Sequence, residues 1–255
     1  MFTTGLTSIT FRSLSVEEIA GAARANGLRA IEWGSDMHVL PGDLARAAYV
    51  RELTARSGLI VSSYGSYYRL GAEADPAAAF APYIASAEAL GAPIIRIWGG
   101  SKGSAQLSDA EFDALAAEGR TLAALAAEHG LTLSLECHPG TVTDEYEPAL
   151  RYLHAVDHPA MRTYWQPNQN FSFEYNLESA RALAPYTTNI HVFSWDATQG
   201  AFCRYPLAHF ADRWHAYLNI FRAQPGDRAL LLEFMHDDRV ETLPETAAEL
   251  NRWNA

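Results

Sequence analysis

Eight short clusters of Ile, Val, Leu and aromatic residues recur along the chain, and stretches with helical periodicity separate them. Clusters of this length and composition are typical of β-strands. The predicted strands cover residues 5–10, 29–33, 59–65, 93–98, 132–138, 161–166, 189–195 and 229–235. Strands that are joined through helices run parallel, and their nearly continuous apolar character predicts that both faces of the sheet are covered.

Residues that begin and end helices fall between the predicted strands. Ser15 with Glu18, and Ser108 with Glu111, form predicted capping boxes. Glycines stand where helical stretches give way to strands, at positions 27, 58, 91 and 130. Eight strand–helix units predict an α/β fold, a single (β/α)₈ TIM barrel formed by one domain over residues 1–255. A doubly wound open sheet is the alternative, but no G-x-G-x-x-G follows the first strand.

The composition narrows the classes of partner and reaction. The formal net charge is −11, which disfavours binding to nucleic acid or to an anionic membrane surface. No apolar run is long enough to span a bilayer, and the first residues do not resemble a secretory signal. Two cysteines are too few for a disulfide framework, so we expect a cytoplasmic protein. The sequence leaves open whether the chain forms a homo-oligomer.

Reactive side chains of a (β/α)₈ barrel gather where its strands end, at the C-terminal face. Carboxylates, histidines, an amide, an arginine and several aromatic residues stand at the ends of the predicted strands. They are Trp33, His38, Tyr64, Arg96, Trp98, Glu136, His138, Gln166, His191, Trp195 and Glu233. Tryptophan rings beside polar groups suit the faces of a sugar ring, and packing in the core is the alternative role.

Two glutamates carry the strongest functional signal, because each directly follows an apolar strand. Burying an unpaired carboxylate costs several kcal/mol. We therefore interpret Glu136 and Glu233 as metal ligands or as a general acid/base pair, with an ion pair to Arg96 as the alternative. His191 lies on the inward side of its predicted strand, either as a third ligand or as a buried histidine. Imidazole together with carboxylate oxygens suits Mn²⁺, Co²⁺ or Zn²⁺.

Four motifs at these strand ends resemble the xylose isomerase-like TIM barrels, the sugar phosphate isomerase/epimerase superfamily that also contains the endonuclease IV type of repair enzyme. They are Leu-Glu-Cys-His-Pro-Gly at 135–140, Tyr-Trp-Gln-Pro at 164–167, Ile-His-Val-Phe-Ser-Trp at 190–195 and Leu-Glu-Phe at 232–234. The resemblance covers essentially the whole chain. It points to a branch of the superfamily other than the named sugar epimerases.

The resemblance implies a divalent metal ion (Mn, Co, Mg or Zn) held by Glu, Asp, His and Glu from strands five to eight. Glu136 and Glu233 match the two glutamates. Gln166 stands at the aspartate position, and Phe193 stands where the family's ligating histidine falls, so His191 is the remaining imidazole. The resemblance also suggests that Arg204 contacts the substrate. The other predicted substrate contacts are Trp33, His38, Tyr64, Arg96, Trp98, His138 and Trp195.

The implied activity is that of an isomerase or epimerase of carbohydrate metabolism acting on a small sugar or polyol. One glutamate would remove a carbon-bound proton next to a carbonyl group, and the metal ion would stabilise the resulting negative charge. The other glutamate or a histidine would return a proton. The changes at Gln166 and Phe193 favour a second hypothesis, a metal-free barrel that binds a sugar without turnover. A retaining glycosidase is a third, and a metallonuclease is disfavoured by the net charge.

Overall fold

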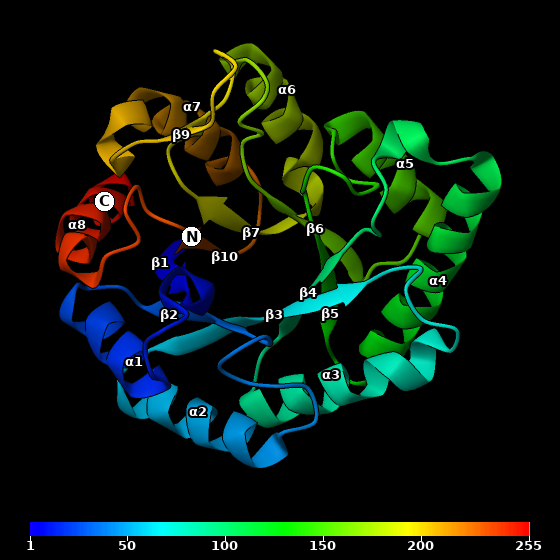
Figure 1. The fold of residues 1–255 in the computed structure, drawn as a ribbon, viewed down its shortest axis with the longest axis horizontal. Helices are drawn as coiled ribbons and strands as arrows, with labels where there is room; N and C mark the ends of the chain where they lie inside the picture. Colours follow the sequence, from blue (N-terminus) through cyan, green and yellow to red (C-terminus); the bar gives the residue numbers. More distant parts are fainter. Residues whose placement is uncertain (255) are drawn as a thin grey trace.

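Residues 1–254 are described by a computed structural model, in which eight parallel strands close into a barrel inside a ring of eight helices (Figure 1). The barrel strands are β1 (Phe2–Thr7), β2 (Ala30–Gly34), β3 (Ile60–Arg69), β4 (Ile94–Trp98), β5 (Thr132–Glu136), β6 (Met161–Trp165), β7 (Thr187–Val192) and β10 (Arg228–Leu232). The helices are α1 (Val16–Ala25), α2 (Leu44–Arg56), α3 (Pro76–Leu90), α4 (Asp109–Glu128), α5 (Tyr146–Val156), α6 (Phe173–Leu183), α7 (Ala211–Arg222) and α8 (Leu243–Trp253). The predicted (β/α)₈ barrel is confirmed.

Local sequence signals set the helix ends as predicted. The Ser15 hydroxyl accepts a hydrogen bond from the Glu18 amide while the Glu18 carboxylate accepts one from the Ser15 amide. The same reciprocal pair forms at Ser108 and Glu111. Gly91 ends α3 in the left-handed conformation, with φ of 71°, which glycine adopts without steric cost. These ends deliver each following strand to the barrel in the same direction.

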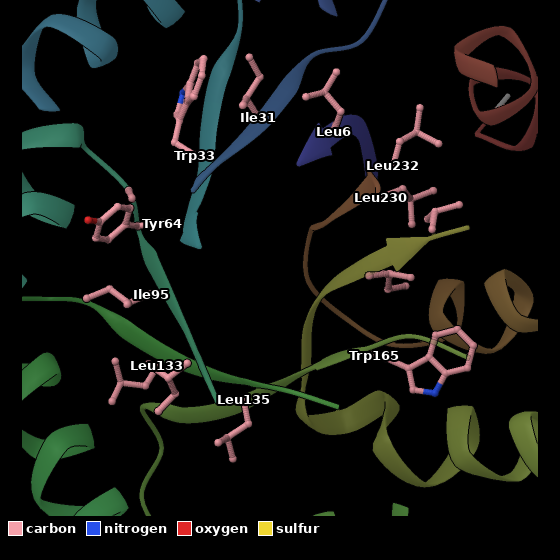
Figure 2. Close-up of a cluster of buried hydrophobic side chains, with 14 of the residues drawn as sticks. Leu6, Ile31, Trp33, Tyr64, Ile95, Leu133, Leu135, Trp165, Leu230 and Leu232 are labelled. Carbon is pink, nitrogen blue, oxygen red and sulfur yellow. The ribbon is translucent and has the colours of Figure 1, made fainter. Parts of the chain in front are cut away.

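Side chains alternate along the strands between two different environments. The outward side chains are apolar and pack against the helices, where Figure 2 labels Leu6, Ile31, Trp33, Tyr64, Ile95, Leu133, Leu135, Trp165, Leu230 and Leu232. Many inward positions are polar, including Glu32, Ser63, Arg96, Ser134 and His191, all of them buried. The prediction of continuously apolar strands is therefore wrong for the inner face, although both faces are covered. The charged groups lie in the half of the barrel interior that is nearer the C-terminal ends of the strands.

Three strand boundaries differ from the predicted ones in ways that matter for the site. β1 occupies residues 2–7, because Ser8–Phe11 turns into a 3₁₀-helix. β3 continues to Arg69, four residues beyond its predicted end. β10 stops at Leu232, so Glu233 is the first residue after the strand.

The connection between β7 and α7 carries a small antiparallel hairpin. Its strands are β8 (Trp195–Asp196) and β9 (Cys203–Arg204), in which Trp195 pairs with Arg204. Within residues 1–254, none of the helices combines the length and hydropathy needed to cross a bilayer.

A glycine substitution tests the close packing inside the barrel. A Cβ atom at Gly5 would lie 2.3 Å from the carbonyl oxygen of Ala30 on the neighbouring strand. We expect Gly5→Ala to lower the free energy of unfolding by about 1–3 kcal/mol, because backbone cannot move aside as a side chain can. Denaturant unfolding measures the change. Gly21→Ala is the control, since nothing lies within 4 Å of a Cβ at this position on α1. It should raise stability by up to about 1 kcal/mol, and equal effects of the two substitutions would contradict the described strand packing.

Candidate metal and acid/base site

Polar side chains from six of the eight barrel strands converge at the C-terminal end of the barrel. Each lies on a strand or immediately after one, and each is at most 8% exposed. They are Glu32 on β2, Arg96 on β4, Glu136 on β5, Gln166 after β6, His191 on β7 and Glu233 after β10. The sequence analysis singled out five of these six residues.

Arg96 lies between two carboxylates at the bottom of this cluster. Its Nε donates to Glu32 Oε1 at 3.0 Å, and its Nη1 donates to Glu136 Oε2. Ser63 donates to the other oxygen of Glu32 at 2.9 Å. Burial alone would raise the pKa of the Glu32 carboxyl, but the charges of Arg96 and His191 outweigh it and lower the pKa to about 2. The alternative considered for Glu136, an ion pair with Arg96, is therefore present in the structure.

His191 faces the remaining oxygen atoms of the cluster. Its Nδ1 lies 2.9 Å from Gln166 Oε1, 3.2 Å from Glu233 Oε2 and 3.9 Å from Glu136 Oε1. Burial would lower the pKa of this imidazole, but Glu233 and Glu32 raise it to about 10. The pKa of Glu233 is lowered despite burial, since His191 and Arg96 are both close. Nδ1 and three oxygen atoms therefore surround a common point.

The charges of the cluster do not balance without a further cation. Three carboxylates are opposed by the Arg96 guanidinium and by a protonated His191, so the buried charge is about −1. It becomes about −2 when the imidazole is neutral, as a metal ligand must be. Glu136, His191 and Glu233 each offer a ligand atom within 4.8 Å of the others. The other ring nitrogen of His191, Nε2, faces Glu32 Oε1 at 3.5 Å. The donor types and the excess negative charge fit a divalent cation bound by oxygen and nitrogen.

A second layer of side chains lies above this cluster, towards the mouth of the barrel. Trp98 pairs in register with Glu136, one inward position above Arg96. The ring of His138 packs on Trp98 with centroids 4.2 Å apart, and the Arg69 guanidinium lies 3.9 Å from the centre of the Trp98 ring. These side chains stand over the buried charges and are half-buried.

The β8–β9 hairpin covers the opposite part of the mouth. Phe193 is buried and stacks on Trp195 with ring centroids 3.8 Å apart. Arg204 lies 5.2 Å from the Trp195 ring and pairs with Asp238 at 2.6 Å. Its charge is therefore already compensated. The Trp195 N–H donates to the carbonyl of Phe234.

Three predicted substrate contacts lie away from the buried charges. Trp33 is fully buried on the outer side of β2, and its N–H donates to Thr54 on α2. The Tyr64 hydroxyl donates to a backbone carbonyl in the β2–α2 connection. Both ring nitrogens of His38 lie within hydrogen-bond distance of the segment that follows β1. The polar atoms of these three side chains are engaged within the barrel wall, so the prediction that they contact a substrate is corrected.

The sequence analysis assigned no role to two residues of the site, Glu32 and Arg69. Glu32 stands near the end of a buried strand, as Glu136 does, so the same reasoning applied to both strands points to it. Arg69 lies beyond residue 65, where the third strand was predicted to end, so no strand-end position was expected there. The β3–β4 register shows an irregularity between Gly65 and Arg69, which carries β3 to the mouth.

Residues 20–253 match the family described as xylose isomerase-like TIM barrel. A curated relative, the 3-dehydroshikimate dehydratase of Bacillus anthracis, is 38% identical over 68 residues, which are 27% of this chain and 24% of the relative. The match therefore spans about a quarter of that relative's length.

Solved structures of the same fold cover nearly the entire chain. The probable 3-DHS dehydratase AsbF of Bacillus anthracis superimposes with a TM-score of 0.83 at 20% identity, over 98% of this chain and 99% of that one. A xylose isomerase-like barrel from Mycobacterium smegmatis, described in complex with magnesium, gives a TM-score of 0.72 at 17% identity, over 98% and 96%.

The buried Arg96 pair should contribute far more to stability than an exposed pair does. We expect Glu32→Gln to lower the free energy of unfolding of the metal-free protein by about 3 kcal/mol, because the guanidinium loses one of its two anionic partners. Glu52→Gln is the control, since its ion pair with Arg56 is exposed. The control should change stability by at most about 0.5 kcal/mol. Urea unfolding of the two variants measures both effects, and equal values would mean that Glu32 does not hold Arg96.

Proposed function

The chain belongs to the xylose isomerase-like TIM barrel family, and we propose that it is a sugar isomerase or epimerase that moves a proton next to a carbonyl group with the help of a divalent metal ion. The observation that carries the proposal is the convergence of His191 Nδ1 with the oxygens of Glu136, Gln166 and Glu233. The substrate class is a ketose or another polyhydroxylated carbonyl compound.

Four side chains would hold the metal ion, namely Glu136, Gln166, His191 and Glu233. The magnesium described in the Mycobacterium smegmatis barrel supports a divalent ion, and Mn²⁺, Co²⁺ and Zn²⁺ suit the same donors. A bound divalent ion supplies a positive charge that polarises a carbonyl oxygen and stabilises the negative charge formed when the neighbouring carbon loses a proton.

The proton transfer is assigned to the two glutamates that also touch the metal position. Glu136 is held from one side by Arg96, which leaves its Oε1 on the side of His191. Glu233 approaches the same imidazole from the end of β10. One carboxylate takes the proton from carbon and the other returns a proton, to the neighbouring carbon in an isomerase or to the opposite face in an epimerase. Arg96 and Glu32 position Glu136 and do not touch the substrate.

The mouth supplies surfaces for a small polyhydroxylated molecule. Trp98 and Trp195 offer ring faces on two sides of the barrel, and both are half-buried. Such rings pack against the C–H faces of sugars. His138 and Arg204 are the polar contacts proposed beside them. Glu136, Gln166 and Glu233 keep a residual exposure of 3–8%, which supports an approach of the ligand from their side of the cluster.

A dehydratase is the second candidate, and the local match to 3-dehydroshikimate dehydratase favours it. Loss of water from a β-hydroxy carbonyl compound also begins with removal of a proton next to the carbonyl group. The two candidates therefore share their first step and differ in the fate of the hydroxyl group.

Metal titration tests the ligand assignment. We expect the protein to retain about one Mn²⁺ or Zn²⁺ per chain after dialysis. The double variant Glu136→Gln/Glu233→Gln should bind the ion with an affinity lower by a factor of at least about 100. Calorimetry and elemental analysis measure both quantities. Glu52→Gln/Glu88→Gln removes the same charge from the exposed surface and should bind metal as the unaltered protein does. Equal metal binding by the two double variants would contradict the assignment.

Solvent exchange tests the chemistry without requiring the final product to be known. In D₂O the metal-loaded protein should introduce deuterium next to the carbonyl group of a substrate from a panel of ketoses and 3-dehydroshikimate, as detected by NMR. Glu136→Gln and Glu233→Gln should each slow exchange by roughly 10²–10⁴-fold. Ligand binding without exchange by any panel member would overturn the proposal in favour of a sugar-binding barrel.

A further inference from the structure

The mouth of the barrel contains an arginine whose charge no acidic residue compensates. Arg69, at the end of β3, is half-buried and forms no ion pair within residues 1–254. Its Nη1 donates to the carbonyl oxygen of Gly100 at 3.3 Å, and its guanidinium lies 3.9 Å from the centre of the Trp98 ring. The neighbouring arginines differ, because Arg12 pairs with Asp36 and Arg204 pairs with Asp238.

The register of β3 and β4 explains why Arg69 reaches the mouth. Gly65 pairs with Arg96 and Arg69 pairs with Trp98, so four steps along β3 match two steps along β4. The two extra residues bring both Tyr67 and Arg69 onto the Arg96–Trp98 column. The Tyr67 ring lies 5.9 Å from the Arg96 guanidinium, below the contact between Arg69 and Trp98. An irregularity of this kind redirects side chains at barrel rims.

Trp98 adds an unfulfilled donor to the same place. Its indole N–H is buried and has no acceptor within residues 1–254. Buried indole N–H groups normally have one. The Arg69 guanidinium lies over the Trp98 ring, and only one of its N–H groups is engaged, by the carbonyl oxygen of Gly100, so other N–H groups remain for an oxygen acceptor. The platform formed by Arg69 and Trp98 therefore offers cationic and neutral donors together.

We propose that the Arg69–Trp98 platform binds a carboxylate group of the substrate, so that the substrate is an acidic carbonyl compound such as a sugar acid. The inference rests on the proposed function for the position of the carbonyl group. A substrate anion close to Glu136 and Glu233 would be repelled by them, so its negative charge belongs at the far end of the molecule. Trp98 lies two residues beyond Arg96, about 7 Å along the strand towards the mouth, so the platform lies on the mouth side of the buried ion pair.

The test compares ligands that differ in one carboxylate. The pairs are D-fructuronate with D-fructose, D-glucuronate with D-glucose, and 3-dehydroshikimate with its methyl ester. Calorimetric titrations use the Mn²⁺-loaded protein and the metal-free protein. In at least one pair the acid should bind roughly tenfold to a hundredfold more tightly than its neutral partner, because the carboxylate forms a charge-assisted hydrogen bond.

Variants assign that preference to the platform. Arg69→Leu should abolish it, and Arg69→Lys should keep part of it, since the charge remains while the planar fork is lost. Arg24→Leu is the control, because it removes an exposed arginine near the other end of the barrel. The preference should be unchanged in this control.

Each outcome separates this inference from the metal-assisted chemistry. If no acid binds, if the neutral partners bind as tightly, or if Arg69→Leu keeps the preference, the carboxylate site is overturned. If Mn²⁺ binds in these samples, the metal centre stands despite that result. If Mn²⁺ fails to bind while Arg69-dependent preference for acids persists, the carboxylate site stands and the proposed function fails.

Discussion

The contact of Arg96 with Glu32 and Glu136 is the interaction on which the rest of the site depends. A guanidinium that is 1% exposed needs anionic partners, and the two carboxylates come from strands on either side of β4 in the barrel order. One arginine neutralises only one of the three buried glutamates in net charge. The carboxylates of Glu136 and Glu233 lie beside His191, and the ligand atoms of these three residues are within 4.8 Å of one another. Electrostatic balance thus links the ion pair to the affinity of the site for a cation.

The barrel supports these charges by dividing each strand between two environments. Apolar side chains on the outer face supply the packing against the helices, so the inner face is free to carry polar groups. The strand ends then form two layers. The lower one holds the carboxylates, Arg96 and His191, and the upper one holds Trp98 with Arg69 and His138. A ligand that enters from the mouth meets an aromatic and cationic layer before it reaches the carboxylates.

The order of strands and helices could be predicted from the sequence, because apolar clusters, capping boxes and stop glycines are local signals. Glu136 and Glu233 could be identified for a similar reason, since a carboxylate after an apolar strand stands out in a single segment. The inward orientation of Glu32 depends on its contact with Arg96, which is 64 positions away in the chain. The position of Arg69 at the mouth depends on an irregular register between β3 and β4. The outward orientation of Trp33 is accompanied by a hydrogen bond to Thr54 of α2. A local pattern can point to Glu32 as a strand-end carboxylate, but its pairing with Arg96 and the positions of Arg69 and Trp33 follow from the tertiary fold.

Anomalous diffraction from crystals grown with Mn²⁺ is the most direct test of the central claim, that the unbalanced buried charge forms a divalent-metal centre. The account predicts one strong peak bounded by Glu136, Gln166, His191 and Glu233, at about 2.0–2.3 Å from their donor atoms. A protein that shows no peak there, with His191 still in contact with Glu233 and Gln166, would contradict it. The buried charges would then be balanced by protonation, and the barrel would be a metal-free one.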